Sequence, residues 1–180
     1  MPKAHTRNST QLAHLTRRFF TSLRRKAPDP SDVDWAKGIL LKSEFALWEK
    51  MSPSDQKHSI AVAKMARNEL PHDAVTIRAG LLHDIGKIAV RSGVVIRVAA
   101  AIAKPLVNED TINRWSQGKG PLATLGAFMA YPQLGASMLR EAGSDEFIVR
   151  WATEHHLPVV EWTVERTRAE VLQRADQFAV

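Results

Sequence analysis

The chain has 180 residues, which fits one domain better than two, and its 44% hydrophobic and 24% charged residues argue against disordered, collagen-like and coiled-coil classes. The absence of Cys excludes disulfides, thiolate metal sites and Cys nucleophiles, so a metal would have to bind to His, Asp or Glu. The net charge of +6 is confined to one end of the chain, which argues against nucleic-acid binding by the rest of it.

The excess of positive charge belongs to an N-terminal arm, residues 1–30. Residues 1–26 contain seven Lys or Arg and no Asp or Glu, which leaves the rest of the chain nearly neutral. Apolar side chains at near-helical spacing in this arm predict a short amphipathic helix: Leu12, Leu15, Phe19, Phe20 and Leu23. This helix either packs on the protein's own body or makes a weak contact with an anionic membrane or a nucleic acid. The proline-rich segment 27–31 predicts a turn before the body.

The body, residues 31–180, is predicted to be helical throughout. Its apolar residues recur at helical spacing between proline, glycine and capping residues, and no segment alternates as a strand would. We expect helices over residues 34–51, 53–70, 72–85, 94–104, 108–116, 121–129, 132–141, 144–156 and 164–178. The most apolar stretch is interrupted by Arg97 and Lys104, so it falls short of the roughly 20 residues of a membrane span. We therefore expect an all-α bundle, located in the cytoplasm because its lack of Cys fits a reducing compartment.

Imidazole and carboxylate groups are predicted on the inward faces of two of these helices. His58 lies four and eight residues before Val62 and Ala66, on the same apolar stripe. His83 and Asp84 directly follow the apolar run AGLL at the end of a buried helix. A buried carboxylate needs a cation or a metal as its partner, so Asp84 is expected to have one.

Three more candidate ligands come from the last two predicted helices. His155 and His156 end one of them, and Asp176 lies on the apolar face of the other, between Leu172 and Ala179. Imidazole nitrogens and carboxylate oxygens that meet inside a helical bundle suit a borderline or hard divalent cation. Taken singly, each His could instead be a hydrogen-bonded core residue, and each Asp a helix cap or the partner of an Arg.

The sequence resembles the HD-domain superfamily of metal-dependent phosphohydrolases, and in particular its small stand-alone bacterial members of the HDIG type. The resemblance covers residues 35–180 and rests on His58 in DQKHS, on His83 and Asp84 in AGLLHDIGK, and on Asp176 in RADQFA. It implies an all-α HD-type bundle with a metal site in its interior. The implied ligands of a first metal are His58, His83, Asp84 and Asp176, and the resemblance also implies that Lys87 reaches a phosphate at that metal.

The same resemblance implies a second metal in the binuclear members of the superfamily, bridged by Asp84. Its further ligands would be a His pair, matched here by His155 and His156, and a His in the context HPxxGA, where this chain has Tyr131 in YPQLGA. A phenol with a pKa near 10 is a poor metal ligand. We expect one tight metal site rather than two, and the alternatives are a binuclear centre and a site without a catalytic metal. His155, His156 and Tyr131 remain candidates for contact with a second metal or a phosphate.

The implied function is hydrolysis of a nucleotide or another small phosphate ester, as a phosphomonoesterase or phosphodiesterase. A divalent metal, whether Fe, Mn, Mg, Zn, Co or Ni, would activate water and neutralise phosphate oxygens, with Asp84 and Lys87 as catalytic residues. The alternative is a catalytically silent HD scaffold that binds a nucleotide or a protein partner and uses any metal structurally. Tyr131 is the residue that favours this alternative.

Overall fold

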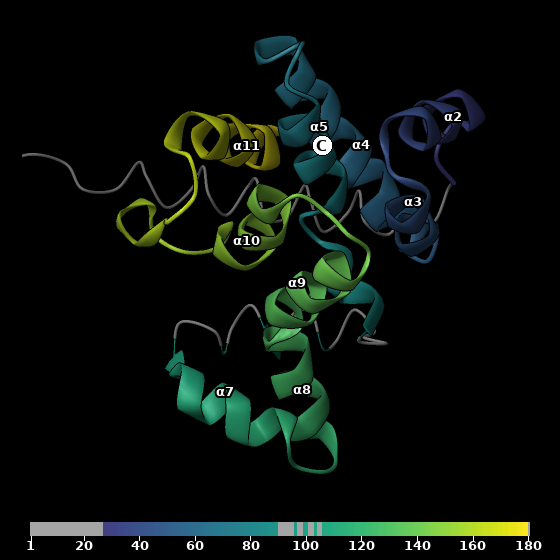
Figure 1. Ribbon diagram of the computed structural model, residues 1–180. Helices are drawn as coiled ribbons and strands as arrows, with labels where there is room; N and C mark the ends of the chain where they lie inside the picture. Colours follow the sequence, from purple (N-terminus) through teal and green to yellow (C-terminus); the bar gives the residue numbers. More distant parts are fainter. Residues whose placement is uncertain (1–26, 90–95, 97–98, 101–102, 104–105, 180) are drawn as a thin grey trace, which may run out of the picture.

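The computed structural model describes residues 27–89, 96, 99, 100, 103 and 106–179, and in this part of the chain every regular element is a helix (Figure 1). The all-α prediction is therefore confirmed. The elements are α2 (Pro30–Ile39), α3 (Lys42–Trp48), α4 (Pro53–Glu69), α5 (Ala74–Leu82), the 3₁₀ helix η1 (Ile85–Ala89), α7 (Glu109–Ser116), α8 (Pro121–Met129), α9 (Tyr131–Glu141), α10 (Glu146–Glu154), the 3₁₀ helix η3 (Val159–Glu161) and α11 (Arg166–Phe178). None of the described helices is both long and apolar enough to cross a membrane.

The single helix expected over residues 34–51 is wrong, because the chain forms two helices there. Leu40 ends α2 and Leu41 precedes α3, and both have extended backbone conformations. The Glu44 carboxylate accepts a hydrogen bond of 2.9 Å from the backbone N–H of Leu41 and so starts the second helix. The first helix also begins earlier than expected, since Asp29 caps it and Pro30 occupies its first turn.

The helix expected over residues 72–85 is shorter in the structure. It begins after Asp73, whose carboxylate accepts the backbone N–H of Thr76 at 3.0 Å, and it ends at Leu82. His83 and Asp84 therefore lie between α5 and η1 rather than within a helix. The predictions for residues 1–26, and most of the helix expected over 94–104, lie outside the described residues.

The main core lies where α4, α5, α10 and α11 pack together, with α3 and α9 at its edges (Figure 1). α4 and α5 can approach closely because Gly80 has no side chain. A Cβ at this position would lie only 2.9 Å from the Cα of Ala63. A fully buried carboxylate, Glu44, also lies in this core. It accepts hydrogen bonds from Arg78 Nε at 2.9 Å and from Ser144 Oγ at 2.7 Å, which ties α3 to α5. Burial of this charge is thus offset by an ion pair.

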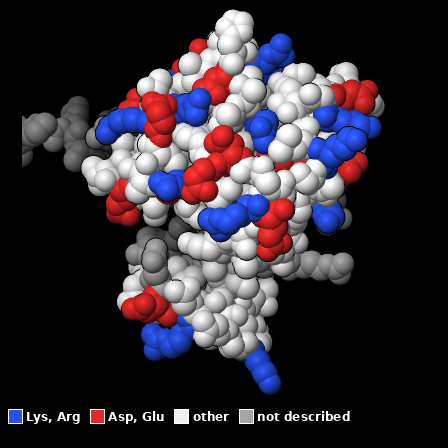
Figure 2. All heavy atoms as spheres, viewed as in Figure 1, with Lys and Arg blue, Asp and Glu red and all other residues white. Residues whose placement is uncertain are grey.

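The hairpin of α7 and α8 extends away from the main core and has a small apolar cluster of its own (Figure 1). Its helices touch at Gly126, where a Cβ would lie 2.6 Å from that of Trp115. The surface of this hairpin shows few charged side chains, whereas Lys and Arg alternate with Asp and Glu over the rest of the visible face (Figure 2). Tyr131 belongs to the hairpin's apolar cluster, in which its ring lies 5.6 Å from that of Phe128. The hairpin therefore packs against one side of Tyr131.

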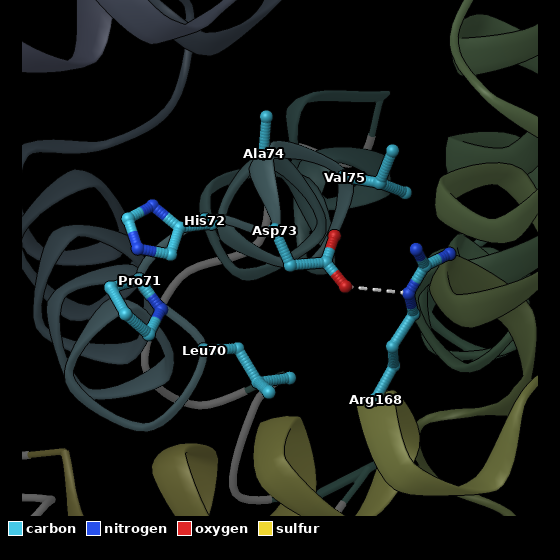
Figure 3. A pocket seen from close by; sticks show the side chains of 7 residues that line it. All are labelled: Leu70, Pro71, His72, Asp73, Ala74, Val75 and Arg168. Atoms are coloured by element: carbon cyan, nitrogen blue, oxygen red, sulfur yellow. Dashed lines mark hydrogen bonds and ion pairs between the residues drawn. The ribbon is translucent and has the colours of Figure 1, made fainter.

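Ion pairs fasten α11 to α4 and α5. Arg174 contacts Glu69 at 2.6 Å, and Arg168 Nε contacts the Asp73 carboxylate at 2.7 Å. The second pair crosses a shallow, open pocket at the start of α5 (Figure 3). Burial would raise the pKa of Asp73, but the hydrogen bonds from Thr76 and Arg168 outweigh it and lower this pKa. The pocket shares no residue with the site described below, and the ion pair across it links α11 to the start of α5.

Candidate metal centre

The end of α5 places a buried histidine and a buried aspartate in the interior of the bundle. The Nδ1 of His83 lies 2.9 Å from the backbone carbonyl oxygen of Gly80. Because a carbonyl oxygen can only accept, Nδ1 carries the hydrogen and the Nε2 atom faces the site. This Nε2 lies 3.4 Å from Oδ2 of Asp84 and 3.8 Å from Oδ1 of Asp176. The helix backbone thus fixes His83 with its Nε2 directed at two carboxylates.

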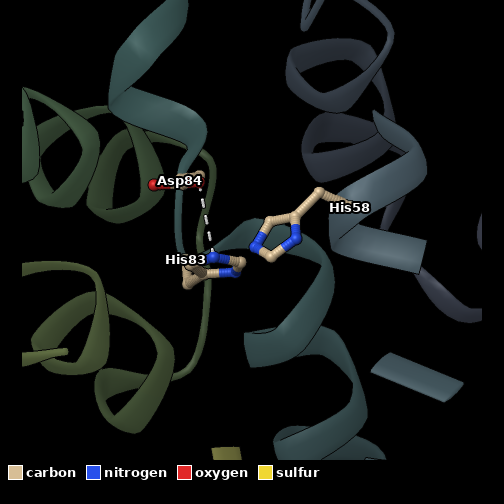
Figure 4. Close-up of side chains that lie close together, drawn as sticks. All are labelled: His58, His83 and Asp84. Atoms are coloured by element: carbon tan, nitrogen blue, oxygen red, sulfur yellow. Dashed lines mark ion pairs between the residues drawn. The ribbon is translucent and has the colours of Figure 1, made fainter. Parts of the chain in front are cut away.

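α4 and α11 supply the remaining groups on this side. His58, near the start of α4, lies with its Nε2 2.8 Å from Oδ1 of Asp176, near the end of α11. The His58 and His83 rings meet edge to face with their centroids 5.4 Å apart (Figure 4). His58, His83 and Asp84 each offer a ligand atom within 4.8 Å of the others. We call these three residues together with Asp176 the first cluster.

A second cluster shares Asp84 and consists of Asp84, His155 and His156, whose ligand atoms also lie within 4.8 Å of one another. Both histidines follow the last residue of α10. His155 Nδ1 lies 3.1 Å from the carbonyl oxygens of Trp151 and Ala152, so it carries the hydrogen. His155 Nε2 is buried, has no hydrogen-bond partner in the described part of the chain, and lies 3.7 Å from Asp84 Oδ1. His156 is exposed, and its ring centroid is 3.9 Å from that of His155.

Tyr131, the first residue of α9, lies between members of the second cluster. Its hydroxyl donates to Asp84 Oδ1 at 2.9 Å and lies 2.6 Å from Nε2 of His156. The start of α9 is held there by contact with η1: a Cβ on Gly86 would lie 1.9 Å from the Tyr131 carbonyl oxygen and 2.9 Å from the backbone nitrogen of Gly135. Two glycines thus permit the approach that brings the phenol to Asp84.

Lys87 lies one turn beyond Asp84, within η1. Its Nζ forms an ion pair with Asp84 Oδ2 and lies 5.5 Å from the centroid of the Tyr131 ring. The lysine side chain is 20% exposed, whereas that of Asp84 is only 5% exposed. Lys87 therefore extends from the buried carboxylate toward solvent, in a position from which its ammonium can meet a charged ligand.

The charges around the first cluster favour ionised carboxylates. Burial would raise the pKa of Asp84, but Lys87 and His83 hold it well below its usual range. Burial would likewise raise the pKa of Asp176, which the hydrogen bond from His58 and the charge of His83 lower strongly. For His83, burial lowers the pKa, and the charges of Asp84 and Asp176 outweigh this effect and raise it. Two anionic groups thus attract a cation, either a proton or a metal, to the space beside His83 Nε2.

In the second cluster, the buried imidazole of His155 is a weaker base than an ordinary histidine. Burial lowers the pKa of His155, so this imidazole is neutral at physiological pH. Burial, and then the charge of Asp84, raise the pKa of Tyr131 well above its usual value of 10.0. Tyr131 therefore remains a protonated phenol beside the Asp84 carboxylate.

The residues of this centre fit a divalent cation. His83 Nε2 lies 3.4 to 3.8 Å from two carboxylate oxygens, and the buried His155 Nε2 has no hydrogen-bond partner among the described residues. Imidazole nitrogens and carboxylate oxygens therefore converge on one place, which is the arrangement that a cation satisfies. Imidazole nitrogen and carboxylate oxygen, without thiolate, are the ligands of a borderline or hard metal ion. Backbone carbonyls that hold the opposite ring nitrogens give each of these two histidines the usual outer support of a metal ligand.

The structure brings all the predicted site residues together: His58, His83, Asp84, Lys87, Tyr131, His155, His156 and Asp176. The sequence analysis missed Glu154, a buried residue directly before the His pair. Its carboxylate accepts hydrogen bonds from the Thr163 N–H at 2.7 Å, the Thr163 hydroxyl at 2.6 Å and the Val164 N–H at 3.2 Å. These bonds fix the segment that links the His pair to α11. A buried acid next to two histidines would have been the signal for this role.

Comparison with protein families matched residues 56–180 to a model described as HD domain. This match covers more than half of the chain and contains both clusters. It begins within α4, so α2 and α3 lie outside it, whereas the resemblance seen in the sequence began at residue 35, within α2. No curated protein and no solved structure matched the chain.

Proposed function

This chain belongs to the HD domain family, and on that premise we propose that it is a metal-dependent phosphohydrolase. HD domains bind divalent metals, and the described residues include two clusters that can hold one. The proposed substrate is a nucleotide or another small phosphate ester, hydrolysed as a phosphomonoester or a phosphodiester. The observation that carries the proposal is the first cluster, in which ligands from α4, α5 and α11 converge around His83 Nε2.

We assign one tight metal to the first cluster, with His58, His83, Asp84 and Asp176 as its ligands. A divalent ion held by these residues would lower the pKa of a bound water toward neutrality and would neutralise phosphate oxygens. The direct contact between His58 and Asp176 at 2.8 Å is consistent with this assignment, because a shared hydrogen between two ligands can be released when a metal binds. The arrangement needs no nucleophile from the protein.

The chain's own residues orient the reaction around Asp84. Its Oδ2 faces His83 and Lys87, and its Oδ1 faces Tyr131, so the plane of the carboxylate is fixed from both sides. We assign Asp84 and Lys87 as catalytic residues: Asp84 as a ligand, and Lys87 as the cation that meets a phosphate of the substrate. The Lys87 ammonium suits this role because it is partly exposed and lies beside the carboxylate.

The alternative function is a silent HD scaffold that binds a nucleotide or a protein partner. One observation favours it: the hydroxyl of Tyr131 lies within hydrogen-bond distance of both Asp84 and His156, so part of the constellation is engaged by a residue that is not an expected ligand. A scaffold of this kind would keep a metal at the first cluster for stability alone.

The experiment that tests the proposal combines metal content with activity. Purified protein is analysed for bound metal and assayed on a panel of nucleotides, phosphomonoesters and phosphodiesters, beside Asp84→Asn and the matched control Asp34→Asn on the exposed face of α2. We expect activity that falls at least about 1,000-fold in Asp84→Asn and is unchanged in Asp34→Asn. Metal binding with no activity above that of Asp84→Asn would favour the scaffold. Failure to take up any metal would contradict the metal-dependent mechanism.

A further inference from the structure

Asp84 presents a different oxygen to each of the two clusters. Its Oδ2 lies 3.4 Å from Nε2 of His83, and its Oδ1 lies 3.7 Å from Nε2 of His155. A second metal ion would therefore need Oδ1 together with nitrogens of His155 and His156. The hydroxyl of Tyr131 lies 2.9 Å from this Oδ1 and 2.6 Å from His156 Nε2, so it stands between two of the three donors.

We propose that Tyr131 limits this centre to one metal ion. Its hydroxyl holds Asp84 Oδ1 and His156 Nε2 in hydrogen bonds, and a second ion would need both of these groups as ligands. The proposal rests on the proposed function, which supplies the first ion. It makes Tyr131 the residue that sets the number of metals, rather than a ligand or a catalytic residue.

The positions of the hydrogens show how Tyr131, Asp84 and His156 satisfy one another in hydrogen bonds. A neutral phenol has one hydrogen, and the Asp84 carboxylate, which pairs with Lys87, can only accept. The phenol hydrogen therefore lies in the bond to Asp84, and the 2.6 Å contact requires His156 Nε2 to donate to the phenol oxygen. Each atom has the partner it needs. In the second cluster, His155 Nε2 has no hydrogen-bond partner among the described residues, and a single imidazole does not hold a divalent cation tightly.

Tyr131 cannot easily leave this position. Only 5% of the residue is exposed, and its ring lies 5.6 Å from that of Phe128 in the apolar cluster of the α7–α8 hairpin. Its backbone is confined by η1, since a Cβ on Gly86 would lie 1.9 Å from the Tyr131 carbonyl oxygen. Coordination by the phenol itself would require loss of its hydrogen beside an anionic carboxylate, which is unfavourable. A second ion would therefore have to displace a buried side chain as well as a hydrogen.

The test is the variant Tyr131→Phe, which removes the hydroxyl and keeps the ring. We expect about one equivalent of Mn²⁺ per chain in the wild type and about two in Tyr131→Phe. Because Asp84 would bridge the two ions, the variant should also show the electron paramagnetic resonance signal of an exchange-coupled pair. The matched control is Tyr131→Phe combined with His156→Ala, which lacks a donor of the second cluster and should return to about one equivalent.

A second measurement uses the wild type and does not depend on folding of a variant. Tyr131 is the only tyrosine of the chain, so tyrosine labelled with ¹³C at Cζ gives one nuclear magnetic resonance signal. We expect this signal to remain that of a neutral phenol when Zn²⁺ saturates the protein. A shift to that of a phenolate would show that Tyr131 is a ligand and would overturn the proposal.

The stoichiometries separate this proposal from the proposed function. About two equivalents in the wild type, or about one in both the wild type and Tyr131→Phe, would overturn the role of Tyr131 while the metal-dependent function stands. No Mn²⁺ bound by either protein would overturn the metal site of the proposed function, and the present proposal with it.

Discussion

The first and second clusters lie on opposite sides of the Asp84 carboxylate, called here its first and second faces. They contain similar residues but differ in the groups that lie between their ligating atoms. On the first face, His58 and Asp176 contact each other directly at 2.8 Å, and His83 Nε2 lies 3.4 Å from Asp84. On the second face, a phenol from another helix lies between Asp84 and His156. A shared hydrogen can be exchanged for a cation, whereas a buried aromatic side chain cannot. Proximity of ligating atoms is therefore not sufficient for a metal site, because the groups between them also decide it.

Removal of one charge from the first face should have the largest effect. Asp176→Asn retains a group that can hydrogen-bond to His58 but loses the anionic ligand, so we expect the affinity for Mn²⁺ to fall more than about 100-fold. A change on the second face, His156→Ala, should alter this affinity by less than about twofold. Competition titration against a metal-sensitive dye measures both. Equal losses in the two variants would contradict the distinction between the faces.

The contact between η1 and α9, which places Tyr131 beside Asp84, can be broken at Gly86. In Gly86→Ala the new Cβ would lie 1.9 Å from a backbone oxygen of Tyr131, so we expect the free energy of unfolding to fall by about 2 to 3 kcal/mol. Gly38→Ala is the matched control, because Gly38 lies in α2 with nothing within 4 Å of the added atom. This control should gain about 0.5 to 1 kcal/mol. Urea unfolding of both variants checks the prediction, and equal stability would show that the contact is loose.

The affinity of the first face for a metal should depend on pH through His83. The charges of Asp84 and Asp176 overcome the effect of burial and raise the pKa of His83 above 6.5, so a proton competes with the metal for Nε2. Affinity for Mn²⁺ should be highest above this raised pKa and should fall about tenfold per pH unit below it. Titration calorimetry between about pH 5 and pH 8 measures this slope. An affinity that stays constant over this range would exclude His83 as a ligand.

The ion pair between Asp73 and Arg168 links α5 to α11 and so keeps His83 close to Asp176. Its removal should have the smallest of these effects. Asp73→Ala removes both the cap of α5 and the partner of Arg168, and we expect a loss of about 1 kcal/mol at pH 7. The pKa of Asp73 is lowered on folding, so its contribution is complete above the ordinary value of 3.8 and is lost as the pH falls through the lowered value.

Chemical unfolding at pH 7 and at about pH 3 compares the wild type with Asp73→Ala. The difference between them should shrink at the lower pH. A difference that does not depend on pH would mean that the carboxylate charge contributes nothing and that only the space it fills matters.

Helical spacing and short motifs were sufficient to predict most of the helices and to single out residues that the structure brings together. They failed at Leu40 and Leu41, where the chain leaves the helix although Gly38 still lies within it and no Pro follows closely. The break depends on Glu44, which starts the next helix and pairs with Arg78, far along the chain. A contact between distant residues leaves no local pattern, so the sequence could not predict this boundary.

The same limit applies to the carboxylates. A buried acid needs a cation, and this rule predicted a partner for Asp84 but does not say which kind of partner. Glu44 is also fully buried and is satisfied by an arginine. The sequence likewise indicated that Tyr131 is a poor ligand. That its hydroxyl reaches Asp84 and His156 depends on the contact between η1 and α9, which only the three-dimensional structure shows.

Both buried histidines of the centre terminate a helix, since His83 follows the last residue of α5 and His155 the last residue of α10. The carboxyl end of a helix carries partial negative charge from its aligned peptide dipoles, worth about 0.3 to 1 kcal/mol to a nearby cation. Two such ends face the same carboxylate, so the backbone itself adds to the attraction for positive charge. Variants that neutralise one acidic side chain should therefore retain a weak preference for cations that no single substitution removes.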